Sequence, residues 1–527
     1  MSAPFVSLDT VEKTYPLRSD GRHGKRDWED GRIPFFVGLI SRLFSPTSKT
    51  TEMASAPDMI VDALSLARAI LSGQTSALAV MEASLERADE RSALGAIAAL
   101  DSQMALDAAR AWDLAGPAGH GAQFGGVPFL GKDLGNHARG LKVTAGCRAI
   151  AARTAAEVAD SDLFSRFRAA GLLPFGLTTV PEFGLCLTSE PPGGPVARNP
   201  WDPSRSPGGS SGGAGVAVAA GIVAIAHATD AAGSIRIPAA CCGLIGLKPT
   251  RGATPNGPAF GNHLIGLTGE LVLARSTRDV AVALDVVAGR GEGPFADPPI
   301  LREAVTPPLR VGVVTSAPRV SVIGLEQADA VVSAAGILES AGHRLVEISA
   351  DEIAAIAAES LQCAVTVLSV SLAGWLDSLE IPDDEVSPLS AAVAADGRST
   401  SATTLYESVR QMARLSHRTW SLFRDADILL TPMLSGPPPA VGAFSSGETA
   451  TGRHWTAVGA LAPYAAIANV AGMPALSLPH GVDSAGLPLA VQLIGPMAAD
   501  HRLLAVAEIL AASRPWYYRW TIAGAPS

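Results

Sequence analysis

The chain contains 527 residues, of which 48% are hydrophobic, 17% are charged and only 5% are aromatic, and its net charge is −10. This balance provides no basic stripe and argues against a nucleic-acid partner; the sequence also shows no apolar run of the roughly 18 residues that a membrane span requires. The five cysteines show no metal-ligand spacing and are typical of reduced thiols in a cytoplasmic protein, so we expect neither a metal nor a cofactor.

Residues 1–52 are expected to form an extension that precedes the folded domain, 53–527. Residues 1–32 are polar and mixed in charge and lack the pattern of a signal peptide. The apolar segment 34–44 is too short to cross a membrane, and we interpret it as part of a loosely docked extension, with a membrane-surface or partner-binding segment as the alternative. Met53 opens a more typical beginning, which is also consistent with a start codon assigned too early.

Helices and short apolar runs alternate from Asp58 onward. Apolar residues at a period of three to four predict a first helix that ends at Gly73. Thr75 or Ser76 can cap a second helix. The apolar run 93–100 is then predicted to be a buried strand.

The next part of the chain continues this alternation. A helix is predicted near 104–112, and a strand over 124–133 delivers Lys132 at its end. The amphipathic helix 160–171 and the strand 172–178 follow.

The pattern changes once in the second half of the chain. Residues 308–345 predict another strand, helix and strand, whereas 351–424 are rich in helix and interrupt the alternation. Alternating helices and strands of this kind predict an α/β fold, with a mixed sheet sandwiched between helices.

Two serines and one lysine lie in segments that are suited to chemistry. Ser210 lies in G-G-S-S-G-G, 208–213, and Ser234 follows T-D-A-A-G. Turns rich in glycine allow backbone N–H groups to approach a substrate and to hold a developing oxyanion. Lys132 lies in G-V-P-F-L-G-K-D, where apolar burial lowers the pKa of a lysine by disfavouring its charged form. These groups are sufficient for amide hydrolysis without histidine.

Together with further motifs, these segments resemble the amidase signature family of Ser-cisSer-Lys amide hydrolases. The further motifs are R-N-P-W-D-P-S-R-S-P before residue 208, A-N-V-A-G-M-P-A-L-S-L-P at 468–479 and G-L-P-L-A-V-Q-L-I-G at 486–495, and all occur in the family's order. Residues 227–252 are most similar to the 6-aminohexanoate cyclic dimer hydrolase-like branch. The resemblance implies the amidase-signature fold, a small-molecule amide substrate, and a helical region at 351–424 that covers the active site and varies with the substrate.

The resemblance also implies a role for each of the three residues. Ser234 is expected to be the nucleophile, and Ser210, 24 positions upstream, to be a bridging serine that follows a cis peptide bond. Lys132, in its neutral form, is expected to be the terminal base. The oxyanion is expected to be held by the N–H of Ser234 and by three backbone N–H groups before it, those of Ala231, Ala232 and Gly233.

Three neighbouring residues are expected to support this site: Ser211 as a structural hydrogen-bond partner, and Asp230 and Arg236 as a brace for the oxyanion turn. The pattern G-x-S-x-G at 209–213 also fits a nucleophile elbow, with Ser211 attacking and a histidine as base. Three prolines among the ten preceding residues argue against the buried strand that an elbow requires. His227 is therefore interpreted as a core histidine.

Two positions depart from the family pattern. Ala232 replaces a glycine, so the turn either uses backbone angles that alanine tolerates or accepts strain. G-L-T-T at 176–179 replaces G-K-T-N, a change that we expect to alter packing only. Two alternative functions stay open, an amidase-type subunit of a tRNA-dependent transamidation complex and an esterase of the same family. A homodimer is compatible with the sequence.

Overall fold

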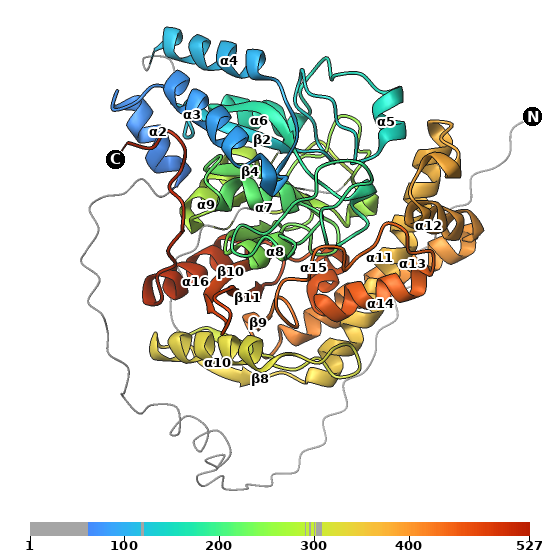
Figure 1. Cartoon of the computed structure of the whole chain (residues 1–527). Helices are drawn as coiled ribbons and strands as arrows, with labels where there is room; N and C mark the ends of the chain where they lie inside the picture. Colours follow the sequence, from blue (N-terminus) through green and yellow to red (C-terminus); the bar gives the residue numbers. More distant parts are fainter. Residues whose placement is uncertain are drawn as a thin grey trace, which may run out of the picture. The chain divides into compact units, whose positions relative to one another are not determined.

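A mixed sheet of eleven strands runs through the part of the chain that the structure describes (Figure 1). The structure is a computed structural model and describes residues 62–116, 121–289, 291–294, 297–299, 301 and 308–526. These residues belong to the unit Met59–Ser527. The predicted extension 1–52, with its apolar segment 34–44, lies outside the described residues.

The sheet has the strand order β1-β3-β2-β4-β6-β5-β10-β11-β9-β7-β8. Its strands pair in parallel at β2–β3, β2–β4, β7–β8 and β7–β9, and antiparallel elsewhere. The strands are β1 Ile97–Leu100, β2 Val127–Lys132, β3 Leu172–Thr178, β4 Ile225–Asp230, β5 Ile245–Lys248, β6 Gly269–Ala274, β7 Arg310–Val313, β8 Arg344–Glu347, β9 Ile428–Pro432, β10 Ala475–Val482 and β11 Pro488–Ile494.

Helices surround this sheet and connect its strands (Figure 1). The described α-helices are α2 Ala63–Leu71, α3 Ala77–Glu90, α4 Ser102–Ala115, α5 Arg148–Arg153, α6 Asp162–Ala169, α7 Gly212–Ala219, α8 Arg236–Cys242, α9 Thr277–Val287, α10 Leu325–Ser340, α11 Ala350–Ser378, α12 Pro388–Ser399, α13 Ala402–Leu422, α14 Thr451–Leu461, α15 Ala465–Ala471 and α16 Asp500–Ser513. Short 3-10 turns are η1 Ser92–Leu94, η3 Glu182–Gly184, η4 Leu264–Gly266 and η5 Asp383–Glu385.

The capping residues explain where the first helices begin. The side chain of Asp62 accepts a hydrogen bond from Ser65 N and starts α2, and that of Ser76 accepts one from Ala79 N and starts α3. Ser76, rather than Thr75, is therefore the cap of the second predicted helix. The predicted strand at 93–100 exists only as β1, and the prediction that it is buried is wrong. It is the edge strand beside β3, and Leu100 is 39% exposed.

The central strands are fully buried because helices pack on them. Every residue of β2, β3 and β4 is buried, and α7, whose eight residues are all small or β-branched, contacts all three. The low bulk of α7 allows its backbone to approach the sheet closely. This arrangement brings the end of β2, where Lys132 lies, close to the residues that precede α7.

The helix-rich region predicted at 351–424 consists of α11, α12 and α13, and α11 and α13 pack on α15. Over an 18-residue window, α11 is long and apolar enough to cross a membrane, with a mean hydropathy of 1.7. The expectation that no apolar segment is long enough to cross a membrane is therefore wrong for α11. Half of that window is buried inside the structure, however, and a core helix passes the same test of length and composition.

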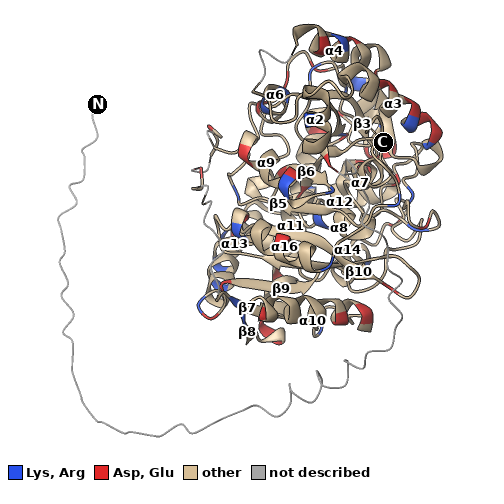
Figure 2. Ribbon diagram, turned by 90° about the vertical axis from the view of Figure 1, so that its left-hand side faces the viewer, with Lys and Arg blue, Asp and Glu red and all other residues tan. Residues whose placement is uncertain are grey.

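The cysteines and the charged residues differ in where they lie. All five cysteines are buried and none forms a disulfide, which agrees with their interpretation as reduced thiols. Figure 2 shows Lys and Arg scattered among Asp and Glu over the described elements. In the described part of the chain, no group of three or more His, Cys, Asp or Glu residues is arranged to hold a metal ion.

Candidate active site

Three chain segments bring the predicted site residues together. Lys132 is the last residue of β2, Ser210 lies just before α7, and Ser234 lies in the turn between β4 and α8. Their exposure rises in the order expected for a relay, from 0% for Lys132 to 2% for Ser210 and 9% for Ser234. Of the three, Ser234 is therefore the most accessible to a substrate.

The amine of Lys132 contacts two hydroxyl groups in the interior. Its Nζ atom lies 2.8 Å from Ser210 Oγ and 2.7 Å from Thr229 Oγ1. Burial, the largest influence, lowers the pKa of Lys132 to about 7, although the charges of Glu270 and Asp230 act to raise it. A buried lysine of this kind is available as a neutral proton acceptor near neutral pH.

The two adjacent serines point to different partners. The Gly209–Ser210 peptide bond is cis, as the family resemblance implies, and Ser210 bonds to Lys132. Ser211 Oγ instead donates to Thr229 O at 3.2 Å and accepts from Thr229 N at 3.3 Å. Ser211 thus joins the start of α7 to β4, which agrees with a structural role and leaves the elbow interpretation without a histidine partner.

The turn before α8 presents backbone N–H groups beside Ser234. Among the described residues, the N–H groups of Ala231, Ala232 and Ser234 have no acceptor, whereas Gly233 N donates to Asp230 Oδ1 at 2.6 Å. The N–H of Gly233 therefore already donates to Asp230, although we expected it to be one of the oxyanion donors. Gly233 alone in this turn has a positive φ, +118°, so Ala232 uses angles that alanine tolerates.

A buried ion pair holds this turn in place. Arg236 donates to Asp230 from both Nε and Nη2 at 2.9 Å, and neither side chain is exposed. Asp230 also accepts from Ile235 N at 3.2 Å and from Asn469 Nδ2 at 3.0 Å, while Arg236 also donates to Gln492 Oε1 at 2.7 Å. Although burial alone raises the pKa of Asp230, the charge and hydrogen bonds of Arg236 hold it well below its ordinary value.

Sequence reasoning missed four polar residues of this site. Thr229 contacts Lys132, Glu270 accepts from His227, and Asn469 and Gln492 complete the Arg236 cluster. A usable signal was present for the last two, because each lies in an apolar motif of the family resemblance, where Gln492 is the only polar residue and Asn469 is one of two. A polar side chain in such a buried segment requires a partner.

The helix-rich region contacts the turn η3, Glu182–Gly184, which lies against Ser210. Glu182 accepts from Ser387 N at 2.9 Å and from Ser390 Oγ at 2.6 Å, at the start of α12. A Cβ atom added to Gly184, in the same turn, would lie 3.2 Å from Ser210 Oγ. The contact between α12 and this turn is thus established, while a role of 351–424 in covering substrate stays a prediction.

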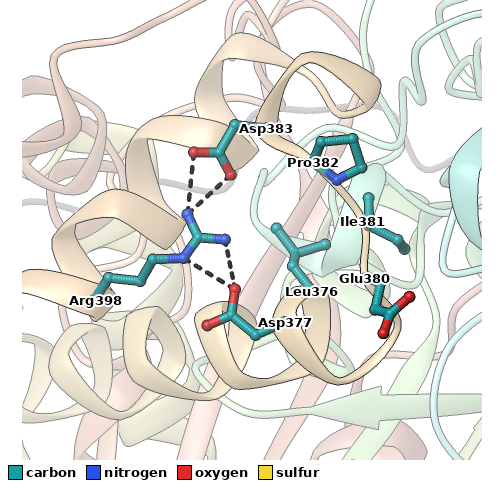
Figure 3. A pocket seen from close by; sticks show the side chains of 7 residues that line it. All are labelled: Leu376, Asp377, Glu380, Ile381, Pro382, Asp383 and Arg398. Carbon is teal, nitrogen blue, oxygen red and sulfur yellow. Dashed lines mark hydrogen bonds and ion pairs between the residues drawn. The ribbon is translucent and has the colours of Figure 1, made fainter.

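A surface hollow of about 460 Å³ lies in the same region but contains none of the predicted site residues (Figure 3). Arg398 lies between two carboxylates there, 2.8 Å from Asp377 and 2.9 Å from Asp383. Because Arg398 is already paired with both carboxylates and none of the predicted site residues lines the hollow, we assign the site to the buried cluster around Lys132. The hollow is lined by Leu376, Asp377, Glu380, Ile381, Pro382, Asp383 and Arg398.

Comparison with known proteins shows the family of the chain. The family model described as Amidase matches residues 79–504, so the chain belongs to the amidase family. A 6-aminohexanoate-cyclic-dimer hydrolase of Pseudomonas sp. (strain NK87) is 34% identical over 495 residues, which cover 88% of this chain and 97% of that protein. The chain is therefore a hydrolase of the amidase family.

Solved structures show the same fold. A structure of 6-aminohexanoate cyclic dimer hydrolase superposes with a TM-score of 0.81 at 30% identity, covering 88% of this chain and 99% of that chain. A glutamyl-tRNA(Gln) amidotransferase structure from Thermotoga maritima superposes with a TM-score of 0.60 at 23% identity, covering 75% of this chain and 85% of that chain. The second likeness shows the fold alone.

Proposed function

We propose that this chain hydrolyses the carbon–nitrogen bond of a small carboxamide through an acyl-enzyme on Ser234. The observation that carries the proposal is the 2.8 Å hydrogen bond between Lys132 Nζ and Ser210 Oγ, made by a lysine with no exposed surface. A base works best when its pKa lies near the working pH, and the pKa of Lys132 is about 7. An ordinary surface lysine would be protonated and unable to accept the proton of a serine.

In the proposed reaction, neutral Lys132 accepts the Ser210 proton while Ser210 accepts the proton of Ser234. The oxygen of Ser234 then bonds to the amide carbon, and the N–H groups of Ala231, Ala232 and Ser234 stabilise the oxyanion. When the carbon–nitrogen bond breaks, the departing amine takes a proton from Ser210, which regains one from Lys132. Water repeats the sequence on the ester of Ser234 and releases the carboxylic acid.

The relay requires a contact between the hydroxyl groups of Ser234 and Ser210. In this structure Ser234 Oγ has no hydrogen-bond partner among the described residues, and it is the side chain of Ser210 that bonds to Lys132. Hydrogen bonds between catalytic groups commonly tighten in the substrate complex. We therefore expect substrate to bring the two serines together.

The similarity to known amide hydrolases supports a proposal for the class of substrate. This chain matches 97% of the length of a 6-aminohexanoate-cyclic-dimer hydrolase. We therefore propose that linear or cyclic amides of small acyl groups are the substrates. The purified chain, without any partner, should release amine from members of a panel of 6-aminohexanoate cyclic dimer, linear aliphatic amides and aryl amides, with the corresponding esters for comparison.

Ser234→Ala is the matched control for this panel. Hydrolysis by the unaltered chain and its loss in Ser234→Ala would support the proposal. Faster cleavage of every ester than of its amide would favour the esterase alternative. No hydrolysis without an added partner would contradict a free-standing amidase and favour the transamidation alternative.

A further inference from the structure

Glu270 lies opposite the residue that contacts the base. In the antiparallel pair of β4 and β6, Glu270 is the cross-strand partner of Thr229, whose Oγ1 lies 2.7 Å from Lys132 Nζ. Residues directly opposite each other on paired strands place their side chains on the same face of the sheet. The carboxylate of Glu270 is thus on the Lys132 face of the sheet.

The loop after β2 provides independent evidence for this closeness. A Cβ atom built on Gly135 would lie 2.7 Å from Thr229 Cγ2 and 2.8 Å from each carboxylate oxygen of Glu270. The Thr229 side chain and the Glu270 carboxylate therefore converge on the space that Gly135 leaves open, three residues after Lys132. With a φ of +104°, Gly135 is also in a conformation that favours glycine.

His227 orients this carboxylate without neutralising it. Its Nδ1 accepts the backbone N–H of Lys132 at 3.2 Å, so its proton is on Nε2, which lies 2.9 Å from Glu270 Oε2. The other donors to Glu270 are Asn136 N at 3.0 Å and Asn262 Nδ2 at 2.8 Å. All three donors are uncharged, and in the described chain no Lys or Arg forms an ion pair with Glu270.

Besides Glu270, only Asp230 acts on Lys132 through its charge, and the other ionisable side chains nearby have hydrogen-bond partners of their own. Asp230 is balanced by Arg236. Asp133 accepts from Thr144 and Gly146, and burial raises the pKa of Asp133 above its ordinary value. His227 carries no charge in the tautomer described above.

The charge state of Glu270 follows from its own contacts. Burial alone would raise the pKa of Glu270, but the hydrogen bond from His227, the charge of that imidazole whenever it is protonated, and hydrogen bonds from Asn262 and Asn136 lower it below its ordinary value. Glu270 is therefore a buried anion whose compensating cation is Lys132 when that lysine is protonated.

We propose that Glu270 is a positioning residue for the base: its buried charge, oriented by His227, keeps Lys132 basic enough to accept the Ser210 proton. The inference rests on the proposed role of Lys132. Removing the charge makes the lysine lose its proton more readily and also makes it a weaker base. The two consequences are separable, because the first moves the pH profile and the second lowers the maximal rate.

The first test is the pH dependence of kcat/KM for Glu270→Gln with the best amide of the panel. We expect the rise on the acid side to move to lower pH by about one unit or more, with a lower plateau in kcat and little change in KM. Glu270→Asp keeps the charge and should stay near the unaltered profile. Asp500→Asn is the matched control, because Asp500 is a buried carboxylate that bonds to Thr250 instead.

The second test does not depend on activity. The chain contains six lysines, so ¹³C-labelled lysine resonances can be titrated in a Ser234→Ala background and assigned with Lys132→Met. Glu270→Gln should lower the Lys132 midpoint. Asn262→Arg should do the same by placing a cation on the carboxylate from a partly exposed site, which provides a second variant if Glu270→Gln does not fold.

These measurements separate the two proposals. A lowered Lys132 midpoint supports the role of Glu270 even if the unaltered chain cleaves no amide, in which case only the proposed function fails. An unchanged midpoint in every folded variant overturns the role of Glu270. A shift of equal size in Asp500→Asn also overturns it, because the effect would then belong to any buried carboxylate.

Discussion

Asp230→Asn tests whether a buried ion pair holds the oxyanion turn. The carboxylate of Asp230 accepts two bonds from Arg236, two from backbone N–H groups of the turn and one from Asn469. Asparagine retains one acceptor oxygen, and its amide group would face donors such as Gly233 N–H. The substitution also leaves Arg236, which has no exposed surface, without its counterion.

Removing one partner of a buried pair typically costs about 3–5 kcal/mol of the free energy of unfolding. We expect Asp230→Asn to lower the midpoint of urea unfolding accordingly and to lower kcat by at least about a hundredfold, because the turn carries the proposed oxyanion donors. The pKa of Asp230 lies well below its ordinary value, so the pair is intact wherever pH exceeds that ordinary value and is lost only as pH falls through the depressed pKa. The stability difference should therefore stay constant across neutral pH.

The control for this prediction is a carboxylate in an exposed ion pair. Glu385 lies 2.7 Å from Arg153 at the surface, and Glu385→Gln should leave both the unfolding midpoint and kcat unchanged. If Asp230→Asn unfolds within about 1 kcal/mol of the unaltered chain and keeps its kcat, the brace has no such role. The ion pair would then be incidental to both the fold and the reaction.

Three further predictions concern the reacting groups. Ser234→Ala should lower kcat by several orders of magnitude without changing the melting temperature, and a fluorophosphonate should label Ser234; labelling at Ser211 would revive the elbow interpretation. In the proposed relay the neutral lysine is the active form and the pKa of Lys132 is about 7, so kcat/KM should fall roughly tenfold per pH unit below that value and level off above it. Lys132→Ala should lose the activity, and a flat pH profile would argue against the lysine. Ala232→Gly should keep activity and accept bulkier acyl groups, and activity that appears only in Ala232→Gly would mean that the natural chain is not a working enzyme.

The sequence predicted several of the helices and strands, and the family resemblance predicted the pair of Lys132 and Ser210 that defines the site. Period-3.6 and apolar-run patterns place α3, β2, α6 and β3 within a few residues of their observed bounds, because local burial and caps determine them. The contact of Ser210 with Lys132 followed from the family resemblance, since 78 positions separate the two residues in the chain.

The remaining contacts depend on strand register and on tertiary packing. Thr229 faces Glu270 only because β4 and β6 pair in one particular register, and a shift of β6 by one residue would turn the Glu270 side chain to the opposite face of the sheet. Gly233 resembled an oxyanion donor in sequence, and its bond to Asp230 depends on how the turn folds back. The exposure of β1 depends on its position at the edge of the sheet, which apolar character does not reveal.

The end of β4 supports both halves of the proposed reaction, and the alternation of a strand explains how. Successive side chains point to opposite faces, so Thr229 faces Lys132 and Glu270 while Asp230 faces Arg236. In the proposed reaction, proton transfer and oxyanion binding thus use two buried charge clusters on opposite sides of one strand end. Because Arg236 balances Asp230 in one cluster and, among the described residues, no cation but Lys132 balances Glu270 in the other, the first is suited to hold geometry and the second to adjust a base.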